Sequence, residues 1–128
     1  MDFGWTSEQQ TLQKELRQFL SENLTVDVAY EMEHGHGGRG RGPLVGELFK
    51  KIAEKGWLGI SWPKEYGGQG GNRMTQYIVE EEFARVGLGV GPAGSGAGAI
   101  MAAGTEEQKR EFVPKLVNGE FSFALGFT

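Results

Sequence analysis

Apolar side chains recur at helical spacing along most of this chain, and the pattern predicts four amphipathic α-helices and one further helix of mostly small residues. The first helix runs from Thr6 to about Asn23, because Thr6 and Gln9 match the Thr-x-x-Gln capping box that closes a helix N-terminus. Four apolar residues then fall on one helical stripe, which is expected to face the core. They are Leu12, Leu16, Phe19 and Leu20.

A Gly-rich segment over 33–43 is expected to form a mobile loop, because each glycine in a helix costs about 1 kcal/mol relative to alanine. The second helix is predicted over 44–55, with lysines near its C-terminal end and Gly56 available to end it. Residues 57–71 combine a short apolar run with Pro63 and several glycines. They predict an ordered turn whose large aromatic residues pack onto the helices. These aromatic residues are Trp57, Trp62 and Tyr66.

The third helix is predicted over 73–86, where apolar residues again share one side. Its acidic run, Glu80 to Glu82, is expected to point largely outward as a solvated face. These carboxylates could in principle supply a general base, but the sequence offers them no partner in a cleft. The apolar side consists of Ile78, Val79, Phe83 and Val86.

The fourth helix, from Pro92 to about Ala103, consists almost entirely of small residues and needs support from packing. Gly94, Gly96 and Gly98 together would cost about 3 kcal/mol relative to alanine. Two explanations of what offsets this cost remain open. Another helix could pack closely against the glycines, or the missing side chains could leave room for a bulky or long ligand.

The fifth helix begins at a second capping box, formed by Thr105 and Gln108, and Gly119 ends it. Pro114 removes one backbone hydrogen bond inside it, which predicts a kink or a shortened helix. Bulky and small residues then alternate over 121–128, the period-two pattern of a β-strand. Because a lone strand leaves its backbone groups unpaired, either another chain completes the sheet or the polypeptide is part of a longer one.

Composition narrows the class of protein. The 128 residues suffice for one domain that folds without a stabilising disulfide or metal. The lack of cysteine excludes disulfides, Cys-ligated zinc and cysteine nucleophiles. The net charge of −4 disfavours nucleic-acid binding, which depends on basic patches. No apolar stretch approaches the roughly 18 residues of a membrane-spanning helix, and no secretory signal is recognisable. A soluble, cytoplasmic chain is therefore expected.

Three short motifs indicate chemistry only weakly. Residues 89–94 match G-x-G-x-x-G, but a helix precedes them where the dinucleotide fingerprint needs a strand, so a helix boundary is the preferred explanation. His34 and His36 have no third metal ligand at an obvious spacing, and no metal site is predicted. Ser95 misses the G-x-S-x-G nucleophile elbow by one glycine. None of these motifs predicts a catalytic site.

Three segments resemble the acyl-CoA dehydrogenase family. They are Gly56–Gly70, with the pattern G-x-x-G-x-x-x-P-x-E-Y-G-G-x-G, Glu80–Arg85 and Gly104–Arg110. The family's order and spacing hold over nearly the whole chain. The resemblance implies an all-α, helical bundle-like N-terminal domain over residues 1–119, followed at 120–128 by the first strand of a middle β domain. A C-terminal four-helix bundle would complete a flavoenzyme that is usually a homotetramer.

The same resemblance implies a reaction and its site. In the family, a glutamate removes the α-proton of an acyl-CoA while the β-hydrogen leaves as hydride to FAD, giving a 2-enoyl-CoA. That glutamate lies in the family's C-terminal domain, so no residue of this chain is assigned as catalytic. The implied flavin-binding residues are Leu125, Gly126, Phe127 and Thr128. The implied wall of the acyl pocket consists of Gly91, Ser95 and Gly98, whose small size suggests a roomy pocket.

The resemblance also implies partners, and it leaves alternatives open. Electron-transfer flavoprotein is the implied redox partner, and a homo- or hetero-oligomer is the implied assembly. An acyl-CoA oxidase on the same fold cannot be separated from a dehydrogenase by these residues. A different alternative is a non-catalytic helical module that docks onto a partner supplying flavin and base. The coding sequence after codon 128 separates the enzyme from the docking module, since a Glu-Pro-x-Ala-Gly-Ser-like continuation favours the enzyme and a stop favours the module.

Overall fold

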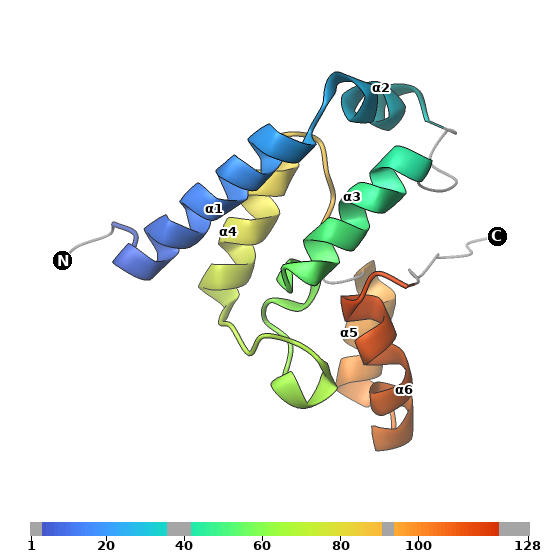
Figure 1. Ribbon diagram of the computed structural model, residues 1–128. Coiled ribbons are helices and arrows are strands. Elements are labelled where there is room, and N and C mark those ends of the chain that lie inside the picture. The colour runs from blue at the N-terminus through green and yellow to red at the C-terminus, as the bar shows by residue number, and fades with distance from the viewer. Residues whose placement is uncertain (1–3, 36–41, 91–93, 121–128) are drawn as a thin grey trace.

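The computed structural model describes residues 4–35, 42–90 and 94–120, and it contains α-helices and short 3-10 turns (Figure 1). No strand occurs within these ranges, so the expected all-α class is confirmed for them. The α-helices are α1 (Ser7–Asn23), α2 (Val26–His34), α3 (Pro43–Glu54), α4 (Arg73–Ala84), α5 (Gly94–Ala103) and α6 (Glu106–Val117). The 3-10 turns are η2 (Trp57–Gly59) and η3 (Lys64–Tyr66).

Helices α1 to α4 form one body, in which α1 lies along α4 and α2 lies on α3 (Figure 1). Leu16, Ile52 and Phe83 are completely buried at its centre, and the ring of Trp57 meets that of Phe19 edge-on at 5.1 Å. Burying apolar surface of this kind stabilises a fold by about 25 cal/mol per Å². We call this cluster the body core. Its remaining buried members are Leu20, Val28, Val45, Leu48, Phe49, Ile78, Val79, Leu88 and Val90.

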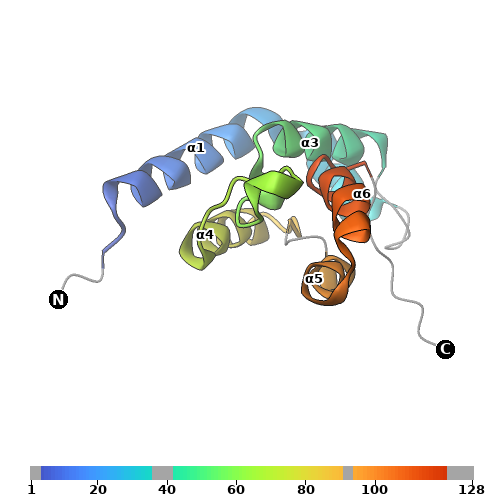
Figure 2. The same ribbon diagram turned by 90° about the horizontal axis from the view of Figure 1, so that it is seen from below.

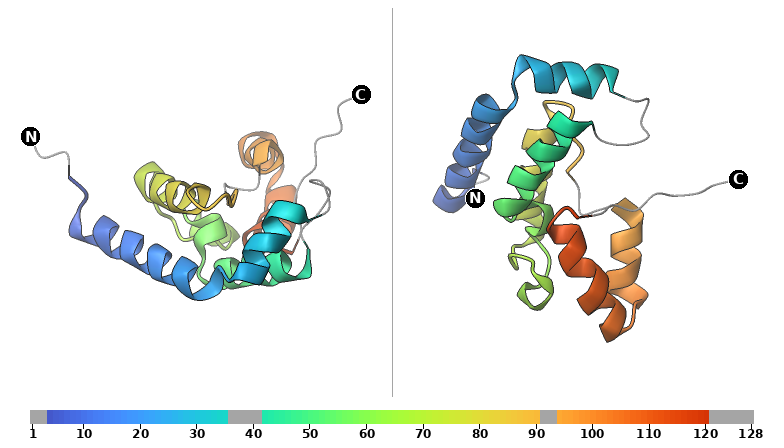
Figure 3. Two further views of the ribbon diagram at one scale, coloured as in Figure 1. Left: turned by 90° about the horizontal axis from the view of Figure 1, so that it is seen from above. Right: turned by 45° about the vertical axis from the view of Figure 1, so that its right-hand side comes forward.

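Helices α5 and α6 form a hairpin that lies away from α1 and α4, with α6 against the turns that follow α3 (Figure 2, Figure 3). The hairpin has its own buried cluster, which we call the hairpin core. Two of its members, Trp62 and Tyr66, come from the turn segment that follows α3. The others are Ala97, Val113, Leu116 and Val117. The described domain therefore has two separate hydrophobic clusters.

Both predicted capping boxes are confirmed. The Thr6 amide donates to Gln9 Oε1 at 2.8 Å, and the Gln9 amide donates to Thr6 Oγ1 at 3.2 Å. Thr105 and Gln108 make the same pair of bonds at 2.9 and 3.2 Å at the start of α6. Each box satisfies two backbone N–H groups that the first helical turn would otherwise leave without an acceptor.

Helix α2 was missed by the sequence reasoning, and the predicted loop over 33–43 was partly wrong. Glu33 and His34 belong to the last turn of α2, and Pro43 already begins α3. Thr25 caps α2 through a hydrogen bond from the Val28 amide, but α2 has no Gln or Glu at the third helical position to complete a capping box. Residues 36–41 of the predicted loop lie outside the described residues.

The remaining helix predictions agree with the structure within two residues. Helix α4 ends at Ala84 and not at residue 86, while α6 continues through Pro114 for one more turn to Val117. Gly56 and Gly119 follow α3 and α6 with φ of 76° and 72°. This left-handed conformation is one that glycine adopts without steric cost, which explains glycine at both helix ends.

The aromatic turn after α3 is ordered and packed, as predicted. Trp57, Trp62 and Tyr66 are all buried, the first in the body core and the other two in the hairpin core. The predicted strand over 121–128 lies outside the described residues. Among the described helices, none is both long and apolar enough to cross a membrane.

Candidate functional site

Helix α5 turns one face to α6, and no other described element covers the opposite face. Ala97 is completely buried in the hairpin core, with Ile100 and Met101 packed beside it. The described residues on the side of the helix opposite Ala97 are exposed, and all of them are small. They are Gly98, Ala99, Ala102 and Ala103. We call this surface the α5 small face.

The surroundings of Gly98 bear on the two explanations left open for the glycines of α5. A Cβ atom built on Gly98 would meet no atom of the described residues within 4 Å. Close packing of a neighbouring helix at this position is therefore not what the described residues show. The open space at Gly98 favours the second explanation, in which the small residues leave room for something that is not part of these helices.

The other predicted site residues can be placed only partly. Ser95 belongs to α5 and lies three residues before Gly98, which is the spacing of one helical face. Gly91 lies outside the described residues. The predicted flavin-binding residues Leu125, Gly126, Phe127 and Thr128 also lie outside them. The structure thus brings one of the predicted pocket residues, Gly98, to an open helix surface.

The N-terminal end of α6 is tied to turn η3 by Tyr66. The Tyr66 hydroxyl donates a hydrogen bond to Glu106 Oε2 at 2.8 Å, and the guanidinium carbon of Arg110 lies 5.9 Å from the centre of the Tyr66 ring. The hydrogen bond to Glu106, together with burial, raises the pKa of the Tyr66 hydroxyl. The same bond lowers the pKa of the Glu106 carboxyl, so the pair is held as a neutral phenol and a carboxylate.

The C-terminal end of α6 is seated on turn η2. Gly59 is buried there, and a Cβ atom added to it would overlap Cγ1 of Val117. Only a residue without a side chain lets α6 come this close to the turn. Gly59 and Tyr66 therefore fix opposite ends of α6, which in turn supports α5 through the hairpin core.

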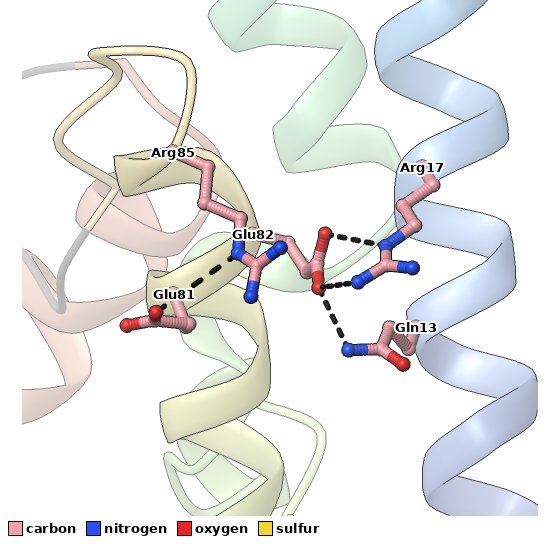
Figure 4. A network of polar contacts seen from close by, with 5 residues as sticks. All are labelled: Gln13, Arg17, Glu81, Glu82 and Arg85. Carbon is pink, nitrogen blue, oxygen red and sulfur yellow. Dashed lines mark hydrogen bonds and ion pairs between the residues drawn. The ribbon is translucent and has the colours of Figure 1, made fainter.

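Glu82 contradicts the prediction that the acidic run of α4 points outward. Its side chain is 3% exposed, and it accepts hydrogen bonds from Arg17 and Gln13 of α1 (Figure 4). The neighbouring Glu81 is exposed and lies 4.0 Å from Arg85, as a solvated carboxylate would. Helical spacing contained the missed signal, because Glu82 lies four residues after Ile78 and so shares its buried face.

The Glu82 network joins α1 to α4. Arg17 donates to both carboxylate oxygens at 2.9 Å, and Gln13 donates to Oε1 at 2.8 Å. These bonds, those from Arg17 above all, hold the pKa of the Glu82 carboxyl below its ordinary value, although burial acts in the opposite direction. A carboxylate occupied in this way is a poor general base. Within the described ranges, no group of three His, Asp or Glu side chains could hold a metal ion.

Comparison with known proteins gives a consistent result. The family described as "Acyl-CoA dehydrogenase, N-terminal domain" matches residues 6–120. The chain is similar to acyl-CoA dehydrogenase FadE26 of Mycobacterium tuberculosis, with 36% identity over all of this chain and 32% of the relative. The chain spans about a third of the length of the relatives that it matches.

Solved structures show the same relationship. The chain resembles the ChsE4–ChsE5 complex of Mycobacterium tuberculosis with a TM-score of 0.79 and 34% identity, covering 94% of this chain and 30% of that one. It resembles the Tcur3481–Tcur3483 steroid ACAD with a TM-score of 0.77 and 35% identity, covering 100% of this chain and 33% of that one. An acyl-CoA dehydrogenase from Bacillus anthracis, complexed with FAD, matches with a TM-score of 0.70 and 28% identity, covering 91% and 20%. Some relatives are therefore FAD-containing, and some form complexes.

Proposed function

This chain belongs to the acyl-CoA dehydrogenase family, as the N-terminal domain of that family, and from this premise we propose that it serves in a flavin-dependent acyl-CoA dehydrogenase. The reaction would convert an acyl-CoA thioester into a 2-enoyl-CoA. Helix α5 would form one wall of the acyl pocket, with Gly91, Ser95 and Gly98 toward the substrate. The base that removes the α-proton would lie beyond residue 128.

The α5 small face carries this proposal. Its exposed residues are glycine and alanine, which leave more space beside the helix than any other side chains would. Binding pockets for small molecules are largely apolar, and exposed apolar helix faces of soluble proteins commonly mark binding surfaces. An acyl chain lying against α5 would bury this face and occupy the open space at Gly98.

The cofactor and partners follow from family membership and belong to the same proposal. We expect FAD to contact Leu125, Gly126, Phe127 and Thr128, which would begin a β domain after a boundary near residue 119. When bound, FAD would supply an acceptor for the β-hydrogen. Electron-transfer flavoprotein would then reoxidise it. The relative in the ChsE4–ChsE5 complex supports a multi-subunit enzyme, and a homo- or hetero-oligomer is expected here.

The test is to enlarge Gly98 to leucine in the complete enzyme and to compare acyl-CoA substrates of different bulk. A leucine side chain would fill the open space, so kcat/KM for a bulky substrate should fall at least about tenfold more than kcat/KM for butyryl-CoA. A steroid-type acyl-CoA is a suitable bulky substrate, because one similar structure is described as a steroid ACAD.

Gly46→Leu is the matched control. Gly46 is also a helical glycine, in α3, and a Cβ atom built on it likewise meets no described atom within 4 Å. It lies in the four-helix body, so its substitution should change kcat/KM for both substrates by the same factor. An equal loss for both substrates in Gly98→Leu would refute the assignment of α5 as a pocket wall. A complete protein that binds no flavin would favour the non-catalytic docking module instead.

A further inference from the structure

The hairpin that carries the α5 small face meets the rest of the domain mainly through the turn segment 57–70. Helix α6 contacts both η2 and η3, and the hairpin core draws Trp62 and Tyr66 from this segment. The body core is a separate cluster, and its members from the turns are Trp57 and the partly buried Leu58 and Ile60. The position of α5 relative to the body therefore depends on how α6 is held against the turns.

Two contacts hold α6, one near each end. Near the C-terminus, Val117 lies against the backbone of Gly59, where shape alone fixes the approach. Near the N-terminus, the Tyr66 hydroxyl donates to the Glu106 carboxylate at 2.8 Å. A hydrogen bond to a charged acceptor is stronger and more directional than a neutral one, so it specifies a position as well as adding stability.

The contact at Glu106 can be transmitted to α5. Val113 of α6 and Ala97 of α5 are both completely buried in the hairpin core, together with the Tyr66 ring. Protein interiors are close-packed, so a shift of one helix moves the side chains packed on it. Only Gly104 and Thr105 connect α5 to α6, so α5 has little freedom to stay in place when α6 shifts.

We propose that Tyr66 is a positioning residue for the acyl pocket, because its hydroxyl bond to Glu106 fixes the α5–α6 hairpin and thereby sets where the α5 small face lies. This inference rests on the proposed function of α5. It concerns substrate selectivity and not the chemical step, since Tyr66 touches the hairpin core and not the α5 small face. The hydroxyl acts through Glu106, and the ring contributes to packing.

The first experiment measures the hairpin directly by hydrogen exchange on the complete enzyme. Tyr66→Phe removes the hydroxyl and keeps the ring, so amides of α5 and α6 should exchange about tenfold faster while those of α1 and α4 remain unchanged. Glu106→Gln keeps an acceptor for the hydroxyl but loses its charge, so it should accelerate the exchange of α5 and α6 by a smaller factor than Tyr66→Phe. Tyr77→Phe, at a tyrosine of α4 that is 51% exposed, is the matched control and should change neither region.

The second experiment measures selectivity with the same bulky acyl-CoA and butyryl-CoA used for Gly98→Leu. Tyr66→Phe should change the ratio of their kcat/KM values by about threefold or more, mainly through KM for the bulky substrate, because small displacements of a pocket wall have large kinetic effects. Glu106→Gln should change this ratio by less than Tyr66→Phe does, because it keeps an acceptor and loses only the charge. A purely stabilising role for Tyr66 would leave this ratio unchanged.

The outcomes separate the two proposals. If Gly98→Leu is selective but Tyr66→Phe leaves the selectivity unchanged, the inference about Tyr66 fails alone, whether or not the exchange of α6 accelerates. If exchange accelerates equally in all helices, the hydroxyl supports the whole domain and the inference also fails. If Gly98→Leu shows no selectivity, the pocket wall is wrongly assigned, and the role of Tyr66 in acyl-CoA selectivity fails with it.

Discussion

Replacement of Arg17 by methionine should loosen the attachment of α1 to α4. The Glu82 carboxylate is 3% exposed and would lose the two hydrogen bonds of 2.9 Å that Arg17 donates, keeping the bond from Gln13. Breaking a fully buried ion pair by removing one partner costs about 3–5 kcal/mol. The Arg17 side chain is 53% exposed, so water can reach its end of the pair. We therefore expect a smaller loss, about 2 kcal/mol.

Replacement of the other partner, Glu82, should lower the stability by less. Glu82→Leu removes the buried charge and leaves Arg17, whose half-exposed guanidinium can be hydrated. Glu82 lies on the same face of α4 as Ile78, so leucine is compatible with its surroundings. The double variant Arg17→Met/Glu82→Leu should lie within about 1 kcal/mol of the wild type, because well-packed apolar residues often replace a buried ion pair without loss. The two substitutions are thus expected to be strongly non-additive.

Native-state hydrogen exchange on the complete protein is the suitable assay, because a multidomain protein need not unfold in one step. Exchange of α1 and α4 amides should accelerate about 30-fold in Arg17→Met and return close to the wild-type rate in the double variant. Exchange of α6 should not respond. A cost below about 0.5 kcal/mol for Arg17→Met, or a double variant as unstable as the sum of both changes, would refute the claim that Glu82 needs its cation.

Two further predictions concern acid stability and the fit of α6. The folded-state pKa of Glu82 is lowered, so its contribution to stability is fully present above the unfolded value of about 4.3 and is lost as pH falls through the folded value. Protection factors of α1 amides, which are corrected for the pH dependence of intrinsic exchange, should therefore fall more steeply between about pH 5 and pH 3 in the wild type than in Glu82→Gln, and parallel curves would contradict this. Gly59→Ala should destabilise the hairpin by about 1–3 kcal/mol, because the new Cβ atom overlaps Val117. The double variant Gly59→Ala/Val117→Ala should recover part of the protection of α6 amides against exchange that Gly59→Ala loses. A Gly59→Ala variant as stable as the wild type would show that α6 is not packed tightly against Gly59.

Strong local signals made most helices predictable from sequence. Thr6 and Thr105 each stand three residues before a glutamine, and this spacing marked both helix starts correctly. Helix α2 lacked such a signal, because Val28 occupies the third helical position and Val26 and Tyr30 are exposed apolar residues. A short helix with apolar residues on its outer side has no clear amphipathic pattern.

The candidate site was predictable only in part, and the reasons are physical. Residues of α5 are nearly all small, so the sequence contained no stripe to show that Ala97 faces inward and Gly98 outward. The burial of Glu82 depends on Arg17, which lies 65 residues earlier in the chain. Local spacing can place a residue on a helix face, but it cannot show that a distant cation makes burial of a carboxylate favourable.

The separation of the hairpin core from the body core also determines how this domain could be re-engineered. Substitutions in clusters without shared partners are nearly additive, so changes to α5 should not need compensation in α1 to α4. A hairpin taken from a relative with another substrate could therefore be grafted as one cassette. The graft would have to preserve its fit to Gly59 and Tyr66, the residues on which α6 is seated. Those two positions would determine whether an exchanged hairpin fits the unchanged body of α1 to α4.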